Sequence, residues 1–224
     1  MSRCAAGKRA AAGFTLLELT LALTLVGVIA GSIGLVMKTC SRALRAGASG
    51  AALESNLRRS MDFVCDRLRA ASTSTLVPLT ESPFSTTQID FQRAVGGVGP
   101  SVVWGNPERI LFEYSPGETD DGVDNDANGL IDEGRVVWIQ NAGSANETRA
   151  TLCNWVREYF EGEEDTGVDD NGNGRIDERG FSIDIEGNRA HVRLSLERMD
   201  SDGRSIVRTL ERTVTFRNQG DDLP

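Results

Sequence analysis

The sequence has very little histidine and fewer basic than acidic residues, and both shortages exclude classes of function. His191 is the only histidine among 224 residues. A zinc site built from several imidazoles is therefore excluded, and a Ser-His-Asp or Cys-His catalytic site would have to use His191. The 24 Lys and Arg residues face 33 Asp and Glu, which gives a net charge of −9. Because no broad basic surface is available, we expect no binding to nucleic acid through its phosphates.

The sequence also lacks the short motifs that are typical of enzymes. It contains no Gly-rich phosphate loop, no Gly-x-Ser-x-Gly elbow and no His-Glu-x-x-His metal motif. His191 is expected on a strand face as an ordinary side chain, and nothing local supports its pairing with Cys153. We therefore predict that the chain is not an enzyme.

One long apolar segment is present near the start of the chain. Residues 14–37 contain a single charged side chain, Glu18, and the run ends at Lys38. As a helix, a segment of this length would rise ~36 Å, which exceeds the roughly 30 Å hydrocarbon core of a bilayer. Residues 1–13 are basic and contain no acid, so the positive-inside rule places the N-terminus in the cytoplasm. Residues 14–37 are therefore predicted to cross the membrane once.

The junction between the basic and apolar segments carries a specific pattern. Gly13 is followed by Phe14-Thr-Leu-Leu-Glu18 and then by the apolar run. This pattern resembles the class III signal of type IV pilins and type II secretion pseudopilins. The resemblance implies that 1–13 is a leader, that a prepilin peptidase cleaves between Gly13 and Phe14, and that the same enzyme methylates the amino group of Phe14. It also implies that Glu18 pairs with the terminal amine of a neighbouring subunit, which agrees with the need of a buried carboxylate for a cation.

Two other interpretations of this segment stay open. A secretory signal peptide also has a basic start and an apolar stretch, and cleavage after Ala30 would release a soluble secreted enzyme. A plain membrane anchor with a chance acid would need no processing. The length of the run favours the pilin-like interpretation, as does Glu18, because an acid at such a place costs roughly 2.5–3.5 kcal/mol on insertion.

The helix is predicted to continue beyond the membrane. Residues 38–71 contain an apolar stripe with i+3 and i+4 spacing, which indicates an amphipathic helix with one face packed against other structure. The stripe consists of Leu53, Leu57, Met61, Val64 and Leu68.

Residues 72–224 are predicted to form a β-rich head. The alternation of Val192, Leu194 and Leu196 with polar residues is typical of a half-buried strand, and the rest of 72–107 is expected to be loop. The predicted fold class is α+β, with a long N-terminal helix on a mostly antiparallel sheet, and this layout resembles a pilin. Strands are predicted near 88–94, 109–114, 135–140, 150–160, 181–186, 190–197 and 205–216.

An acidic sequence occurs twice in the head, 45 positions apart, as Asp124-Asn-Asp-Ala-Asn-Gly-Leu-Ile-Asp-Glu133 and Asp169-Asp-Asn-Gly-Asn-Gly-Arg-Ile-Asp-Glu178. Asp, Asp or Asn, Asn, Gly and Asp occupy positions 1, 3, 5, 6 and 9, which resembles the first nine positions of an EF-hand or dockerin calcium loop. Alternate side chains of such a turn point oxygens at one centre, and position 7 offers its carbonyl. The predicted ligands are Asp124, Asp126, Asn128, Leu130 and Asp132 in the first copy and Asp169, Asn171, Asn173, Arg175 and Asp177 in the second.

The repeat departs from a full EF-hand at position 12, where Arg135 or Gly180 replaces the bidentate Glu. The missing oxygens are expected from elsewhere in the loops 120–133 and 165–178. Candidates for this role are Asp120, Asp121, Glu133, Asp165 and Glu178. The predicted calcium ions are structural and not catalytic, and the alternative is a pair of solvated acidic turns.

Of the four cysteines, Cys4 would leave with the leader. Cys40 and Cys65 lie on one predicted helix, ~37 Å apart by helical rise, and cannot bond to each other. Cys65 and Cys153 either form a disulfide in an oxidising periplasm or stay reduced and buried.

The segment 208–218 resembles the closing strand of J-type minor pseudopilins and of W-type minor pilins, and Glu18 argues against the K-type. The resemblance implies a single-pass inner-membrane protein with a periplasmic head, a structural subunit at the tip of a type II secretion pseudopilus. Its partners would be the H-, I- and K-type minor pseudopilins and the major pseudopilin. A minor pilin of a type IV pilus and a membrane-tethered, calcium-dependent binding module are the alternatives.

Overall fold

The computed structural model describes residues 15–98, 101–200 and 202–218. The chain divides into two compact units, Met1–Ala46 and Gly47–Pro224. The predicted leader 1–13 and the cleavage point between Gly13 and Phe14 lie outside the described residues.

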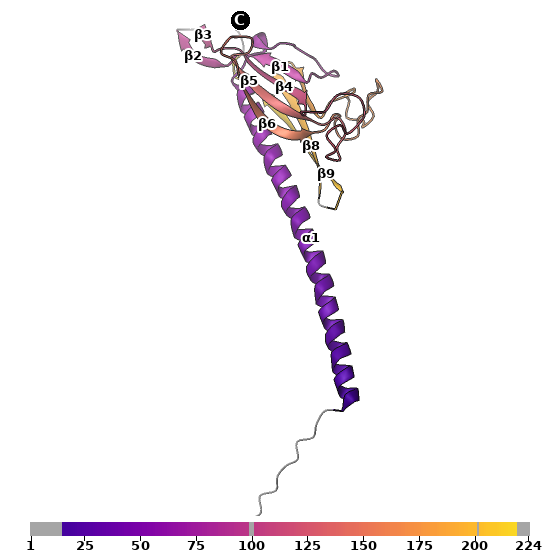
Figure 1. Ribbon diagram of the computed structural model, residues 1–224. Coiled ribbons are helices and arrows are strands. Elements are labelled where there is room, and N and C mark those ends of the chain that lie inside the picture. The colour runs from indigo at the N-terminus through magenta and orange to yellow at the C-terminus, as the bar shows by residue number, and fades with distance from the viewer. Residues whose placement is uncertain (1–14, 99–100, 201, 219–224) are drawn as a thin grey trace, which may run out of the picture. The chain divides into compact units, whose positions relative to one another are not determined.

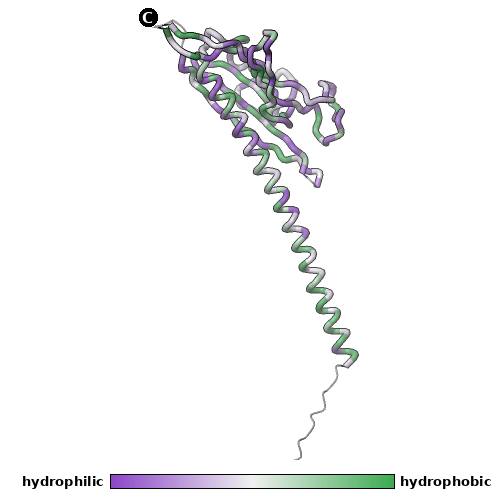
Figure 2. The backbone as a smooth tube through the Cα atoms, turned by 60° about the vertical axis from the view of Figure 1, so that its left-hand side comes forward, coloured by the Kyte–Doolittle hydropathy of each residue, from purple (hydrophilic) through white to green (hydrophobic). Residues whose placement is uncertain are grey.

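In the first unit the described residues begin helix α1 (Leu16–Arg69), whose second part belongs to the second unit. The apolar side chains of this first part are exposed, from Leu16 at 82% to Ile29 at 49%, and Figure 2 shows the same stretch as mainly hydrophobic. The helix is long and apolar enough to cross a membrane, and none of its most apolar window is buried within the protein. By length and composition α1 is therefore a candidate membrane span.

The second part of α1 is amphipathic, and its apolar face is covered by the sheet of the same unit. Leu57, Met61 and Leu68 have no exposed surface, and Leu53 and Val64 are almost fully buried. The predicted stripe is thus confirmed at all five positions. The helix is followed by a short 3-10 helix, η1 (Thr73–Thr75).

Seven antiparallel strands form the main sheet of the second unit, in the order β1-β4-β5-β6-β8-β7, with β9 paired to β8 (Figure 1). A bridge between Thr86, just before β1, and Ile183 of β7 brings the two ends of this order together, so that the sheet curls nearly into a barrel. The described residues therefore have the predicted α+β layout. The strands are β1 (Gln88–Phe91), β4 (Glu108–Tyr114), β5 (Gly134–Gln140), β6 (Thr148–Val156), β7 (Phe181–Glu186), β8 (Arg189–Met199) and β9 (Ser205–Thr215).

The two faces of β7 and β8 have different characters. Val192, Leu194 and Leu196 belong to the hydrophobic core that includes the face of α1. Because successive side chains of a strand point to opposite faces, Arg193 and Ser195 lie on the other face. These two polar residues are also buried, so the outer face of the sheet is covered here too.

The structure corrects the prediction that residues between 94 and 107 are loop. They contain a separate two-stranded sheet of β2 (Ala94–Val98) and β3 (Ser101–Trp104). Gly96, Gly97 and the short length of both strands weaken the sequence signal for β structure here.

Cys65 and Cys153 are both buried, and they are free cysteines, as is the exposed Cys40. The structure thus has the arrangement of the second alternative, two free buried thiols, and a disulfide in an oxidising periplasm stays a prediction. The two thiols have different neighbours, because Cys65 lies near Arg212 of β9 whereas Cys153 lies near Ser60 of α1.

Candidate metal centre

The two acidic repeats lie in the two longest connections of the main sheet. Loop 1 (residues 115–133) joins β4 to β5, and loop 2 (residues 157–180) joins β6 to β7. The loops lie side by side at one end of the sheet in Figure 1. A pocket of about 360 Å³ between them is lined by residues of both, among them Glu133 and Glu163.

The first acid of each repeat organises its turn. Asp124 accepts backbone hydrogen bonds from Asn128 (3.1 Å) and Gly129 (2.8 Å). Asp169 accepts the equivalent bonds from Asn173 (3.0 Å) and Gly174 (2.7 Å). The two repeats therefore fold in the same way, and the side-chain oxygens of these acids turn toward the inside of the loop.

The backbone conformation at position 6 explains why each repeat has a glycine there. Gly129 has a φ of 92° and Gly174 a φ of 86°. This left-handed conformation is costly for residues with a Cβ. It allows the sharp bend that brings the oxygens of positions 1, 3 and 5 together.

The structure places one further carboxylate beside each repeat that was not among the predicted ligands. Glu118 accepts a hydrogen bond from the backbone of Asp126 (2.7 Å), and Glu163 accepts one from the backbone of Asn171 (3.0 Å). Oxygens of Glu118, Asp124 and Asp126 lie within 4.8 Å of one another, a grouping that could hold a metal ion. The sequence did contain a signal for these two residues, because Glu118 and Glu163 are separated by the same 45 positions as the two repeats.

The acid at the end of each repeat also lies at its site. Glu133 accepts a hydrogen bond from the side-chain amide of Asn128 (2.7 Å). Glu178 accepts the equivalent bond from Asn173 (3.1 Å). Both acids had been expected as extra ligands, and the structure places them beside the predicted ligand at position 5.

Several of these carboxylates are buried with an oxygen that has no partner. Glu118, Glu133 and Glu163 expose 5%, 2% and 5% of their surface, and the Oε2 atom of each has no hydrogen-bond partner. Burial raises the pKa of Glu133, the hydrogen bond from Asn128 opposes this, and the charges of Asp126 and Glu118 raise the pKa further. An orphaned buried carboxylate oxygen is costly unless a proton or a cation compensates it.

No protein-family model, no curated protein and no solved structure matches this chain.

The donor set fits calcium well. Carboxylate and amide oxygens without nitrogen or sulfur suit a hard cation, and calcium accepts six to eight oxygens in a flexible arrangement. Loop 1 offers the carboxylates of Glu118, Asp124, Asp126 and Glu133 and the amide oxygen of Asn128. In the described part of the chain no Lys or Arg side chain forms an ion pair with these four acids, so a divalent cation would supply their missing countercharge.

The aspartate at position 9 of each repeat accepts backbone hydrogen bonds from the start of its own loop. Asp132 accepts hydrogen bonds from the backbone of Gly122 (2.7 Å) and Asp121 (3.4 Å). Asp177 binds the backbone of Gly167 (2.9 Å) in the same way. These aspartates cap the start of each loop, so the structure gives them a structural contact outside the grouping around positions 1 and 3.

Asp120, Asp121 and Asp165, which were expected as extra ligands, have other contacts in the structure. Asp120 lies with Asp132 and Glu158 in a second acidic group, but Arg179 forms ion pairs with both Asp120 (3.8 Å) and Glu158. This group already has a cation. Asp121 accepts bonds within its own turn, from the backbone of Val123 (3.1 Å) and the amide of Asn125 (3.0 Å), and Asp165 lies beside the hydroxyl of Tyr159.

Position 7 was expected to contribute its backbone carbonyl. Leu130 is buried at this position in loop 1. Arg175 occupies it in loop 2, and its guanidinium turns to Asp184 of β7 (3.2 Å). The side chain of Arg175 therefore fixes loop 2 to the sheet. That the backbone carbonyl at position 7 binds the ion stays a prediction.

At the other end of the chain, Glu18 forms a reciprocal pair with Thr15. The backbone N–H of Glu18 donates to Thr15 Oγ1 (3.2 Å), and the backbone N–H of Thr15 donates to Glu18 Oε2 (3.3 Å). This is a capping box, which satisfies two free amides at the start of α1. Glu18 therefore has a local role at the start of α1, and its role between subunits stays a prediction.

Proposed function

We propose that this chain is a minor pseudopilin of the J-type, a structural subunit at the tip of a type II secretion pseudopilus. In this proposal the helix from residue 14 anchors the subunit in the inner membrane with the head in the periplasm, and later packs with other subunits in the filament. The observation that carries the proposal is the combination of Gly13, Phe14 and Glu18 with an exposed apolar helix that continues into a β-rich head. A minor pilin of a type IV pilus would have the same membrane anchor and the same packing between subunits, but it would belong to a pilus instead of a secretion pseudopilus.

The geometry at Glu18 supports an assembly role. One of its carboxylate oxygens accepts the weak bond from Thr15 (3.3 Å), and the side chain is otherwise exposed beside apolar neighbours. In lipid such an acid needs a cation. The new ammonium that cleavage before Phe14 would create is a suitable partner, and the amine of an adjacent subunit would meet it when subunits pack.

We further propose that loops 1 and 2 each bind a structural calcium ion. The orphaned oxygens of Glu118, Glu133 and Glu163 support this part of the proposal. The ions would rigidify the two long connections. A stable head suits a subunit that is pushed against folded cargo as the filament grows.

A membrane-tethered, calcium-dependent binding module is the second candidate. The acidic pocket between the two loops favours it, because a partner with a cationic group would find several carboxylates there. This candidate needs the membrane anchor and the ions, but it does not need processing at Gly13 or contact between subunits through Glu18.

Mass spectrometry of the protein from its native membrane tests the first proposal. We expect a chain that begins at Phe14 and carries a methyl group on its amino nitrogen. A chain that begins at Gly31, or one that keeps the leader, contradicts the pilin-like processing.

The assembly role is tested by Glu18→Ala. We expect the variant to enter the membrane normally and to show reduced recovery with the other pseudopilin subunits after crosslinking. Glu54→Ala is the matched control, because Glu54 lies on the same helix and forms ion pairs with exposed or half-exposed arginines. Equal recovery of both variants would favour the tethered module.

A further inference from the structure

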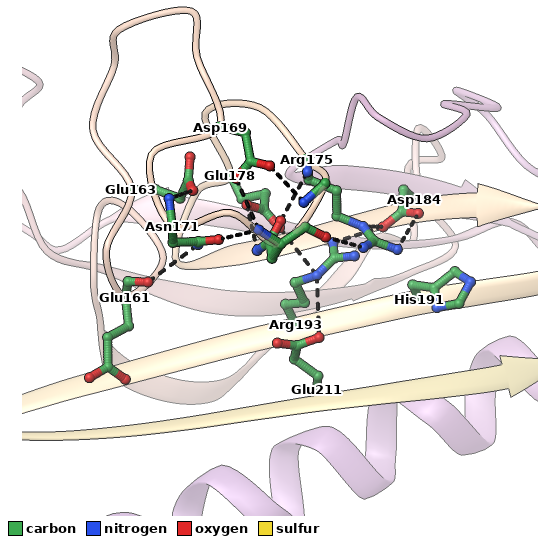
Figure 3. Close-up of polar contacts among 12 residues, drawn as sticks. Glu161, Glu163, Asp169, Asn171, Arg175, Glu178, Asp184, His191, Arg193 and Glu211 are labelled. Atoms are coloured by element: carbon green, nitrogen blue, oxygen red, sulfur yellow. Dashed lines mark hydrogen bonds and ion pairs between the residues drawn. The ribbon is translucent and has the colours of Figure 1, made fainter.

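Loop 2 covers a buried charge on the outer face of the sheet. Arg193 on β8 exposes 1% of its surface, and Asp184 on β7 and Glu178 of loop 2 expose none. Figure 3 shows the Arg193 side chain rising from its strand toward Glu178 and Asp184, below the turn that contains Asp169 and Asn171. An arginine at this depth is stabilised only by acids in contact with it.

One of the acids that neutralise Arg193 is a candidate calcium ligand. Arg193 Nη1 lies 2.7 Å from Asp184 Oδ1, and Arg193 Nε lies 3.2 Å from Glu178 Oε1. The exposed Glu211 of β9 is further from it, at 3.7 Å. Burial raises the pKa of Glu178, and the amide of Asn173 and the charge of Arg193 oppose that rise. The protein therefore supplies part of the countercharge of loop 2 by itself.

Loop 1 has no such internal cation. Its equivalent acid, Glu133, has a hydrogen bond from Asn128 but no ion pair within the described ranges, and its Oε2 has no partner. The loops differ at position 3 as well, where Asp126 of loop 1 is replaced by Asn171. Loop 1 thus brings four carboxylates to its site without a basic partner, whereas loop 2 brings three, one of which contacts a buried arginine.

We propose that the two loops bind calcium with unequal affinity, so that loop 1 fills first and loop 2 responds to a higher calcium concentration. Calcium affinity in oxygen-ligand loops rises with the number of ligand charges, and in loop 2 the ion has to compete with Arg193 for Glu178. This inference rests on the calcium part of the proposed function and adds a graded response to it.

The same contacts give the loops different behaviour without calcium. In loop 2, the pair between Arg193 and Glu178 and the pair between Arg175 and Asp184 hold the turn on the sheet when no ion is bound. In loop 1 the carboxylates of Glu118, Asp124 and Asp126 repel one another within 4.8 Å. Loop 2 therefore stays ordered without calcium, and loop 1 loosens.

The order of binding is tested by titrating calcium into the full chain in detergent and measuring the heat of binding by calorimetry. Asp124→Ala removes the organising acid of loop 1 and leaves loop 2 as the working site, whereas Asp169→Ala does the reverse, so the two variants are matched controls. We expect the Kd of the Asp124→Ala chain to be at least about tenfold higher than that of the Asp169→Ala chain. Equal constants, or tighter binding by the chain that keeps only loop 2, would overturn the inference while leaving calcium binding in place.

A second set of variants tests the cause. In the Asp124→Ala background, Arg193→Met is expected to tighten calcium binding by loop 2, because Glu178 becomes available to the ion. If that variant does not fold, Asn171→Asp in the same background restores the missing ligand charge and is expected to tighten binding about tenfold. An unchanged Kd in the folded variant overturns the assigned cause. Absence of binding heat from the unaltered chain at millimolar calcium would remove the calcium part of the proposed function itself, and this inference with it.

Hydrogen exchange on the unaltered chain gives an independent readout. After chelation we expect the amides of Gly129 and Leu130 in loop 1 to lose protection, and those of Gly174 and Arg175 in loop 2 to keep it. Equal loss in both loops contradicts the role of Arg193 as an internal cation.

Discussion

A carboxylate that is almost completely buried must be protonated, paired or bound to a cation, because its desolvation is not otherwise compensated. Glu118 fits this description, with a backbone hydrogen bond at one oxygen and no partner at the other. Its neighbours Asp124 and Asp126 are acids too. At the residue scale this glutamate is therefore a stronger indication of an ion than the exposed aspartates of the repeat.

We expect Glu118→Gln to weaken calcium binding by loop 1. The amide keeps the shape of the side chain and accepts the bond from Asp126, but it removes one ligand charge, so the Kd should rise by about tenfold or more. Calorimetry on the full chain in an Asp169→Ala background measures this site alone. Glu164→Gln is the control, since Glu164 is exposed beside the equivalent acid of loop 2, and an equal effect of both variants would argue for general electrostatics instead of ligation.

Cys153 gives a pH-dependent prediction. Burial raises the pKa of this thiol from 9.0 to about 11, although hydrogen bonds from Ser60 and the Val136 backbone oppose the shift. Because the folded pKa lies above the unfolded one, the stability linked to the neutral thiol is complete below pH 9. It is lost as the pH rises through 11, to the extent of at most ~2.7 kcal/mol.

Denaturant unfolding of the full chain at pH 8, 9.5 and 11, followed by tryptophan fluorescence, measures this dependence. Cys153→Ala should reduce the fall in the free energy of unfolding above pH 9, and the part that remains includes Cys65, whose pKa burial also raises to about 11. Cys40→Ala, at an exposed position, should leave the fall unchanged. The same slope in all three proteins would mean that Cys153 does not titrate in this range.

The sequence alone can identify the residues of a site that lie close together along the chain. It gives little indication of residues that reach the site from distant positions. The candidate ligands at positions 1, 3 and 5 lie within one turn, so their spacing alone was enough to propose them. Glu118 reaches the site from six positions before the repeat, and only the shared offset with Glu163 indicates it. Arg193 lies on β8, which pairs with β7, the strand that follows loop 2. No local sequence pattern links Arg193 to Glu178.

At the scale of elements, periodicity predicted most of the structure. The apolar stripe of α1 and the strands that contribute alternate side chains to the core are long enough to give clear periods. The hairpin of β2 and β3 lacks both length and a buried face, and it was missed. How loop 2 folds back on the sheet is a tertiary property that arises after the strands have paired.

Gly180 marks the point where loop 2 returns to the sheet. Its N–H donates to the carbonyl of Glu158 (2.8 Å), and its carbonyl accepts from Ser195 (2.7 Å). A Cβ at this position would lie 1.9 Å from the carbonyl oxygen of Arg157. Only glycine allows this close approach of two backbones.

We therefore expect Gly180→Ala to lower the free energy of unfolding by ~3 kcal/mol, at the upper end of the cost of overpacking. Gly96→Ala is the matched control, because a Cβ there meets nothing within 4 Å, and it should change stability by less than about 0.5 kcal/mol. Denaturant unfolding of both full-length variants measures the difference, and a harmless Gly180→Ala would show that this junction can move apart.

On the scale of the whole molecule, the two units depend on different surroundings. The apolar side chains in the described part of the first unit are exposed, so a surrounding of lipid or detergent would suit this candidate span. The second unit has its own core, but two of its connections hold acids that the core does not neutralise. Calcium should therefore stabilise one unit and leave the other unaffected.

Thermal unfolding of the full chain in detergent tests this division. If one loop has a Kd near 10 μM, then 1 mM calcium adds about 2.7 kcal/mol through that loop, which corresponds to a rise in Tm of roughly 5–10 °C over the chelated protein. Tryptophan fluorescence reports the second unit because all three tryptophans, Trp104, Trp138 and Trp155, lie there. Magnesium at the same concentration should give a smaller shift, since it demands a rigid octahedral site.

The control for this experiment is the double variant Asp124→Ala with Asp169→Ala, which should show no calcium-dependent change in Tm. Helical circular dichroism that persists above the fluorescence transition would come from the apolar part of α1, whose hydrogen bonds depend on detergent and not on the ions. An equal Tm with calcium and with chelator would contradict a structural ion in either loop. A loss of the whole helical signal together with the tryptophan transition would instead mean that the two units unfold as one.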